Sequence, residues 1–160
     1  PRLTIGHSIA EPLRIHGLYD AAGRRARVRE WLEAVELSPA DAYIDRFPSD
    51  LSGGQLQRVA VARALILEPE LMLYDEPSAG LDPITAARLD GLIASLDRER
   101  GMTSIIVTHE VEELFALCDM VMMIHEGKIV ALDTPQALRE TSDPLVRQFV
   151  EGRADGPITV

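Results

Sequence analysis

The chain has 160 residues, of which 46% are apolar and 26% charged, and this composition favours a globular domain, or part of one, over a disordered chain. The net charge of −10 argues against generic DNA coating, which needs a basic surface to displace counterions. A single cysteine, Cys118, excludes a disulfide framework and a cysteine zinc cluster, and no apolar run approaches the roughly 18 residues of a membrane span. Because the first residue is Pro1, we expect a processed, trimmed or incomplete chain.

Residues 1–50 are predicted to form helices joined by loops. Apolar residues recur at helical intervals over residues 8–15 and 24–35. The second of these stretches begins with a cluster of arginines and continues with glutamates, namely Arg24, Arg25, Arg27, Arg29, Glu30, Glu33 and Glu36. We interpret the cluster as a solvated helix face whose glutamates supply the opposite charge, with nucleic-acid binding as the less favoured alternative.

A further helix is predicted over residues 52–66. Ser52 is a good N-cap residue, and Gln55 three positions later completes a capping-box pattern. Gly53 and Gly54 stand at the helix start, where backbone N–H groups and the helix dipole favour an anion. Taken alone, this pattern is better explained by an ordinary capped helix after a glycine turn.

Three short apolar runs predict buried strands, at residues 71–74, 103–108 and 120–124. Helical patterns fill the stretches between them, at residues 84–100 and 111–117. Apolar strands that alternate with helices predict an α/β unit with a parallel sheet. Next come a tight turn at residues 125–128, a strand at 129–132 and two helices, capped by Thr134 and by Ser142 or Asp143.

Two adjacent carboxylates, Asp75 and Glu76, follow the first predicted strand, at the end where an open parallel sheet places ligands. An aspartate there can hold Mg²⁺ through water, because Mg²⁺ takes one or two carboxylates and keeps several waters. The neighbouring glutamate can polarise an attacking water. The alternative is that both carboxylates only solvate the strand end.

His109 ends the second predicted strand. If the first two strands are neighbours, His109 lies at the same sheet edge as Asp75 and Glu76 and can donate a hydrogen bond to a terminal phosphate. A lone histidine is more often structural, and we interpret the other three histidines in that way. Residues 78–83 alone predict a turn and a cap before the next helix.

In their order and spacing, these motifs resemble the nucleotide-binding subunit of ATP-binding-cassette (ABC) transporters. The LSGGQ at residues 51–55 is similar to the family signature, the run ending in Asp75 and Glu76 to its Walker B motif, residues 78–82 to its D-loop, and His109 to its switch histidine. The resemblance covers essentially the whole chain. It implies an α/β fold, namely part of a P-loop NTPase-type ABC ATPase domain: a helical subdomain at residues 1–68, then later strands of the parallel core sheet with C-terminal helices at 69–160.

The resemblance also implies roles for the carboxylates and the histidine. Asp75 would hold Mg²⁺ through water, and Glu76 would be the general base for ATP hydrolysis. His109 would contact the γ-phosphate of ATP.

The signature motif would act on the nucleotide of a second subunit. In the head-to-tail dimer that the resemblance implies, the γ-phosphate held by the opposite subunit would be bound by Ser52, Gly53, Gly54 and Gln55. Asp82 would communicate across that interface. The dimer would drive transmembrane permease subunits from the cytoplasmic, inner face of the cell membrane, through a groove near residues 1–30, and no nucleic-acid partner is expected.

One family motif is missing from the sequence. A phosphate-binding loop has the pattern GxxxxGK[ST], but the single lysine, Lys128, has Met122 at the first glycine position and Ile129 at the Ser/Thr position. The family's Q-loop glutamine and adenine-stacking aromatic residue are not found either. We therefore expect a C-terminal piece of the domain that binds Mg-ATP negligibly by itself, with a longer parent that is an active ATPase.

The two ends of the chain resemble different branches of the family. Residues 1–6 and 10–18 resemble the ATPases of dipeptide and oligopeptide importers, whereas residues 82–85 and the more distinctive 143–157 resemble those of bacterial lipid-asymmetry (phospholipid transport) systems. We therefore predict the energising subunit of a phospholipid transporter, with an oligopeptide importer as the alternative. A non-catalytic dimerisation or regulatory half-domain stays open, whereas an ABC ATPase of DNA repair or of the ribosome is disfavoured by the single cysteine and the acidic balance.

Overall fold

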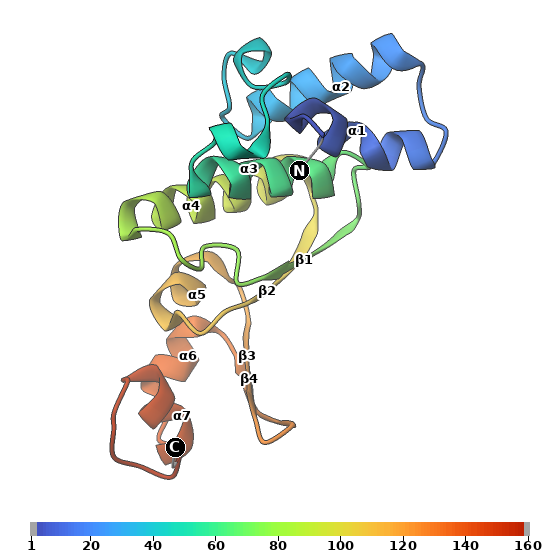
Figure 1. The fold of residues 1–160 in the computed structure, drawn as a ribbon. Helices are drawn as coiled ribbons and strands as arrows, with labels where there is room; N and C mark the ends of the chain where they lie inside the picture. The colour runs from blue at the N-terminus through green and yellow to red at the C-terminus, as the bar shows by residue number, and fades with distance from the viewer. Residues whose placement is uncertain (1–2, 159–160) are drawn as a thin grey trace. The chain divides into compact units, whose positions relative to one another are not determined.

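The computed structural model describes residues 3–158 and divides the chain into two compact units, one ending at Val107 and the other beginning at Thr108 (Figure 1). Pro1 and Arg2, which belong to the importer-like start of the sequence, lie outside the described residues. The division into domains at residue 68 stays a prediction. Each unit is described by itself below.

The first unit begins with helices that surround a closed core. Its first elements are α1 (Ile5–Ile15), α2 (Ala21–Ala34), the 3₁₀ turns η1 (Ala40–Ala42) and η2 (Pro48–Asp50), and α3 (Gly53–Leu65). Ile5, Ile9 and Leu13 recur at the spacing of one helix face and are buried against α2 and α3. The helices predicted in this region are confirmed, and α1 and α2 both begin earlier than the apolar pattern indicates.

An arginine of α3 supplies a hydrogen bond that α1 lacks. Pro12 lies inside α1 and has no N–H to donate to the carbonyl oxygen of Ser8, one turn earlier. Nε of Arg63 donates to that oxygen at 3.1 Å, and Nη2 of the same side chain donates to Oε2 of Glu11 at 2.7 Å. The proline is therefore tolerated because a neighbouring helix satisfies the freed carbonyl group.

The arginines of α2 pair mainly with other parts of the chain. Of the glutamates predicted to balance them, Glu30 does pair with Arg27, but Glu33 accepts a hydrogen bond from the N–H of Ala40 and Glu36 pairs with Arg58. The other arginine contacts reach distant segments, in the pairs Arg25–Asp45, Arg29–Asp41 and Arg27–Glu68. Arg25, Arg29, Glu30 and Glu33 are exposed, which agrees with the predicted solvated face, and most of the opposite charge comes from other segments of the chain.

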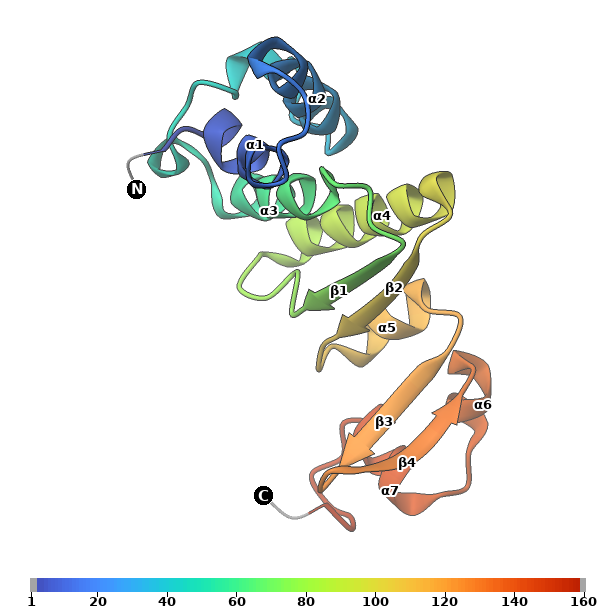
Figure 2. The same cartoon turned by 90° about the vertical axis from the view of Figure 1, so that its right-hand side faces the viewer.

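A parallel strand pair follows the helices in the first unit. Strands β1 (Leu71–Asp75) and β2 (Thr103–Val107) pair in parallel, from Leu71 opposite Thr103 to Asp75 opposite Val107, and helix α4 (Pro83–Arg100) connects them along one face (Figure 2). Helix α4 ends where Gly101 adopts a left-handed conformation, with φ of 64°. The predicted parallel pairing is confirmed for these two strands, and they are neighbours.

Only one face of this strand pair is covered in the described structure. Met72 and Tyr74 point to the core that includes α4, and each is 6% exposed. On the opposite face the exposed fractions are 50% for Leu71, 70% for Leu73, 51% for Ile105 and 57% for Val107. The prediction of fully buried strands was therefore wrong for these side chains, because α4 shields a single face.

The second unit consists of α5 (Val111–Leu117), β3 (Val121–His125), β4 (Lys128–Asp133), α6 (Pro135–Glu140) and α7 (Pro144–Val150). The apolar run at residues 120–124 was predicted to belong to the parallel sheet. The strand found there, β3, instead pairs with β4 in antiparallel fashion. Glu126 and Gly127 both have positive φ, of 48° and 72°, which suits a two-residue hairpin turn. Thr134 and Asp143 cap α6 and α7 as predicted.

Candidate functional site

The carboxylates of the predicted site lie at the carboxyl end of β1. Asp75 is the last residue of the strand and is exposed to solvent. The backbone N–H of Glu76 donates to the carbonyl oxygen of Val107 at 2.8 Å, and its own carbonyl oxygen accepts from the N–H of Ala79 at 3.2 Å. These bonds fix the backbone of Glu76 beside the end of β2.

Glu76 holds an uncommon backbone conformation. Its φ is +48°, in the left-handed region, which costs a residue with a Cβ atom about 1–3 kcal/mol. The other described left-handed residues that are not glycine lie in loops next to helices or in the β3–β4 turn, namely Tyr19, Glu36, Glu68 and Glu126. Glu76 instead follows a strand directly, and strain of this kind is concentrated at functional sites.

The segment from Glu76 to Asp82 leads from this strand end to helix α4. Ser78 is 7% exposed, and its carbonyl oxygen accepts from the N–H of Leu81 at 3.2 Å. Asp82 caps α4, since its Oδ1 accepts from the N–H groups of Ile84 and Thr85, each at 3.1 Å. Hydrogen bonds from the side chain and then the backbone of Thr85 hold the pKa of Asp82 below its usual value.

The tip of α3 carries the predicted anion-binding motif. Ser52 Oγ accepts from the N–H of Gln55 at 3.4 Å, and Oε1 of Gln55 accepts from the N–H of Ser52 at 3.0 Å, so the predicted capping box is confirmed. Ser52 and Gly53 are exposed, whereas Gly54 and Gln55 are partly covered. As an acceptor in the cap, the Ser52 hydroxyl group keeps its proton available for donation.

His109 belongs to the second unit, two residues after the end of β2. Its side chain is exposed, with Nε2 at 3.7 Å from Oε1 of Glu110. The adjacency of β1 and β2, on which its predicted position depends, is confirmed. Its placement beside Asp75 and Glu76 stays a prediction.

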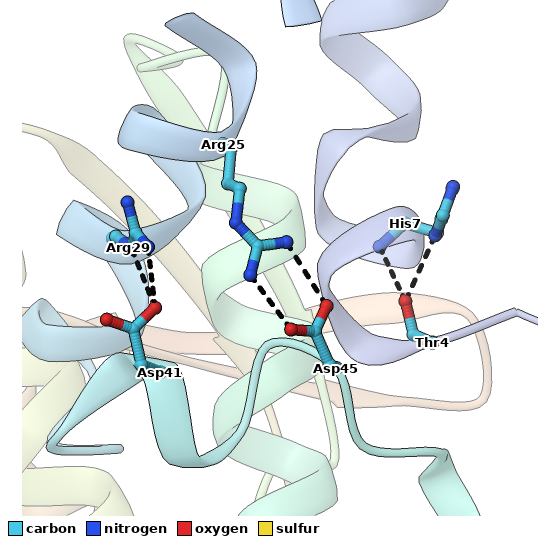
Figure 3. Close-up of polar contacts among 6 residues, drawn as sticks. All are labelled: Thr4, His7, Arg25, Arg29, Asp41 and Asp45. Carbon is cyan, nitrogen blue, oxygen red and sulfur yellow. Dashed lines mark hydrogen bonds and ion pairs between the residues drawn. The ribbon is translucent and has the colours of Figure 1, made fainter. Parts of the chain in front are cut away.

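A hollow of about 260 Å³ lies between α1, α2 and the segment that follows η1. Figure 3 shows charged groups of this region, where Arg25 donates to both carboxylate oxygens of Asp45 at 3.1 and 2.8 Å. Hydrogen bonding from Arg25 lowers the pKa of Asp45. Thr4 and His7 also line the hollow, with Oγ1 and Nδ1 3.0 Å apart. The sequence analysis predicted a groove near residues 1–30 but did not identify the residues that line it, because they come from separate segments with no common motif.

The carboxylates at the end of β1 suit a Mg²⁺ ion that is also coordinated by phosphate and water. They do not suit a metal ion whose ligands all come from the protein. In the described part of the chain, no group of three or more His, Cys, Asp or Glu side chains is placed to hold a metal. Mg²⁺ needs only one or two carboxylates when phosphate oxygens and waters complete its shell. Asp75, with Glu76 beside it, meets that requirement, whereas the lysine loop that would hold a triphosphate is not found in this sequence.

Comparison with known proteins identifies the class of protein that these motifs define. The family model described as "ABC transporter" matches residues 1–79. Relatives named as ATP-binding proteins of transport and import systems align over 98% of the chain with 42% and 39% identity. The chain belongs to the ABC transporter ATP-binding family, and its parallel strand pair and signature helix agree with part of the P-loop NTPase-type domain of that family.

Among its relatives is the intermembrane phospholipid transport system ATP-binding protein MlaF of Escherichia coli K12, which is 42% identical over 98% of this chain. MlaF of Haemophilus influenzae is 39% identical over 94%, and the methionine import ATP-binding protein MetN of Caulobacter vibrioides 39% over 98%. The chain spans 57%, 56% and 46% of these curated relatives, respectively. Within residues 3–158, no helix has the length and apolar character needed to cross a membrane.

Proposed function

We propose that this chain forms the signature and Walker B part of the ATP-hydrolysing subunit of an ABC transporter. The observation that carries the proposal is the strand end at Asp75 and Glu76, where a strained glutamate is fixed to the neighbouring strand. The exposed, capped helix tip at Ser52 in the same unit supports it. Both features are expected of a subunit that handles a nucleotide phosphate.

Each residue at the strand end has a distinct task. Bound Mg²⁺ would neutralise charge on the phosphate oxygens. Asp75 would hold the waters of the ion. Glu76 would accept a proton from the water whose oxygen attacks the terminal phosphorus, while the bond to the bridging oxygen breaks and ADP leaves. His109 donates a hydrogen bond to that phosphate.

The helix tip serves a second copy of the site. Ser52, Gly53, Gly54 and Gln55 offer a hydroxyl group, backbone N–H groups and the positive end of the helix dipole to the γ-phosphate of the nucleotide held by another nucleotide-binding subunit. A head-to-tail pair of subunits then completes two sites. Asp82 contributes to their communication, through its cap of α4.

The hollow between α1 and α2 is the surface that we assign to the permease. It lies within the region predicted to receive the membrane subunits, and its wall mixes cations and anions, including Arg25 and Asp45. A permease segment with both charges would match this wall. The subunit would then work at the inner, cytoplasmic face of the membrane, held there by the permease.

Phospholipid is the cargo that we favour. The two MlaF relatives, named for intermembrane phospholipid transport, cover 98% and 94% of the chain, and residues 143–157 resemble the same branch. Import of a small solute is the alternative, because MetN covers the chain equally and the glycine betaine/carnitine/choline transport protein OpuCA of Bacillus subtilis is 41% identical over 79%. A non-catalytic half-domain is a further alternative.

The hydrolytic role is tested by Glu76→Gln in the longer protein that contains this chain together with a GxxxxGK[ST] loop. We expect the variant to retain ATP-dependent dimerisation, measured by light scattering, and to lose ATP turnover. Glu70→Gln is the matched control, since Glu70 precedes the opposite end of β1 and should leave turnover unchanged. Normal hydrolysis by Glu76→Gln would remove Glu76 from the role of base.

The cargo is tested with the transporter purified together with its permease. Stimulation of ATP hydrolysis by phospholipid vesicles, with no response to methionine or glycine betaine, is the expected result. Stimulation of ATP hydrolysis by one of the small solutes alone would indicate that the subunit belongs to an importer of that solute. In a non-catalytic half-domain, hydrolysis would be absent under every condition.

A further inference from the structure

The tip of α3 packs tightly against the first turn of α4. A Cβ atom placed on Gly54 would lie 2.5 Å from Cγ2 of Thr85, closer than real Cβ atoms approach other atoms. A Cβ atom on Gly53 would lie 3.5 Å from Cδ2 of Leu81, which is an ordinary van der Waals contact. Of the two signature glycines, only Gly54 is therefore required by the packing of its own chain.

The obstructing methyl group belongs to a residue that is tied to the cap of α4. Thr85 donates its N–H to Oδ1 of Asp82 at 3.1 Å, which fixes the backbone that carries the methyl group. Because a β-branched side chain in a helix has few rotamers, rotation about χ1 offers Cγ2 few positions away from Gly54. The methyl group is therefore part of the surface on which the tip of α3 rests.

The same contacts extend to the carboxylates at the end of β1. Asp82 ends the short segment that begins at Glu76, and within that segment Leu81 faces Gly53. The segment is closed by the bonds from Ala79 to Glu76 and from Leu81 to Ser78. A continuous set of contacts therefore joins Glu76 to the tip of α3 within one unit.

We propose that Thr85 is a positioning residue that sets the location of the Ser52–Gly54 tip relative to Asp75 and Glu76, and that residue 54 is glycine because of this contact. The consequence for catalysis rests on the proposed function, in which the tip binds the nucleotide of a second subunit. Displacement of the tip should weaken that binding and leave the carboxylates in place. The effect is expected on the ATP concentration that supports dimerisation and on KM more than on kcat.

The packing is tested in the 160-residue chain by urea unfolding followed by circular dichroism. Alanine normally stabilises a helix relative to glycine, so a lower unfolding midpoint for Gly54→Ala would mean that the clash outweighs this gain. Thr85→Ser removes the methyl group and keeps the hydroxyl group, and the double variant Gly54→Ala/Thr85→Ser should recover most of the lost midpoint. Gly53→Ala is the matched control, and Thr85→Ser should not alter its effect. Purely additive changes in the Gly54 double variant would overturn the proposal.

The functional consequence is tested in the longer protein with the same variants. Gly54→Ala should raise the ATP concentration for half-maximal dimerisation at least tenfold, and Thr85→Ser should bring it back to within about threefold of the wild-type value. Recovery of the unfolding midpoint without recovery of dimerisation would overturn the positioning role, because Gly54 would then be needed for direct approach of the nucleotide. Absence of ATP hydrolysis in the wild-type longer protein would contradict the proposed function instead, and the unfolding series would still report on the packing.

Discussion

The helices α1–α3 and the strand pair β1–β2 belong to the same unit but bury their apolar side chains to different extents. In the helical region Ile5, Trp31 and Leu32 are fully buried, whereas in the strand pair Leu73 and Val107 remain 70% and 57% exposed. A helix has one apolar stripe, which a neighbouring helix can cover, but a strand of a parallel sheet has two faces to cover. The described chain therefore closes its helical core and covers one side of its sheet.

The largest effect is expected from Trp31→Ala, which tests the closed core. Trp31 is fully buried, and the guanidinium carbon of Arg100 lies 4.8 Å from the centre of its ring. Loss of the ring should lower the free energy of unfolding by about 3–5 kcal/mol, measured by urea unfolding with far-UV circular dichroism. Trp31→Phe is the control and should lose less. If the two variants were equally stable, the helical core would be less tightly packed than the burial indicates.

A smaller effect is expected from Asp45→Asn, which tests the exposed ion pair that ties α2 to the segment after η1. The pKa of Asp45 is lowered in the fold, so its contribution to stability is present above its unfolded pKa of about 3.9 and is lost as the pH falls through the folded value. The variant should therefore have a lower melting temperature than the wild type near pH 7, and the difference should shrink as the pH falls through the lowered pKa of Asp45. Asp155→Asn removes the same charge from an exposed residue that forms no ion pair within residues 3–158, and it should show no such convergence. A pH-independent difference would contradict the assigned role of the Arg25–Asp45 pair.

The smallest effect on stability is expected from Leu73→Ser, which tests the uncovered face of the strand pair. Because Leu73 is 70% exposed, its replacement should change the free energy of unfolding of this chain by less than about 0.5 kcal/mol. Binding of an apolar dye such as ANS should fall, since the variant removes part of an exposed apolar patch. A large loss of stability would show that this face is covered in solution, for example by a second copy of the chain.

Local signals in the sequence were sufficient for most elements of the fold. Ser52 with Gln55 predicted the start of α3, the helical pattern over residues 84–100 predicted α4, and the apolar run before Asp75 predicted the strand β1. Each of these signals depends on residues within a few positions of one another. The family motifs are also short and local, and the roles that they imply for the candidate site stay predictions.

The features that the sequence did not predict depend on contacts between distant segments. The partners of the α2 arginines, the antiparallel pairing of β3 and the approach of Gly54 to Thr85 all bring together residues with no shared local pattern. The exposed face of β1 was missed for the same reason, since an apolar run does not reveal what covers it. The left-handed backbone of Glu76 gave no signal either, because glutamate seldom adopts that conformation.

The backbone of Glu76 also determines which replacements at that position can be interpreted cleanly. A glycine there would relieve the steric cost of a positive φ, and an asparagine would tolerate it, whereas a β-branched residue would increase it. Variants that discard the carboxylate could therefore unfold at higher temperature than the natural chain. In that case the chain would keep glutamate for its proposed chemical role although the residue lowers thermal stability. The rise in melting temperature when Glu76 is replaced would measure how much stability is lost.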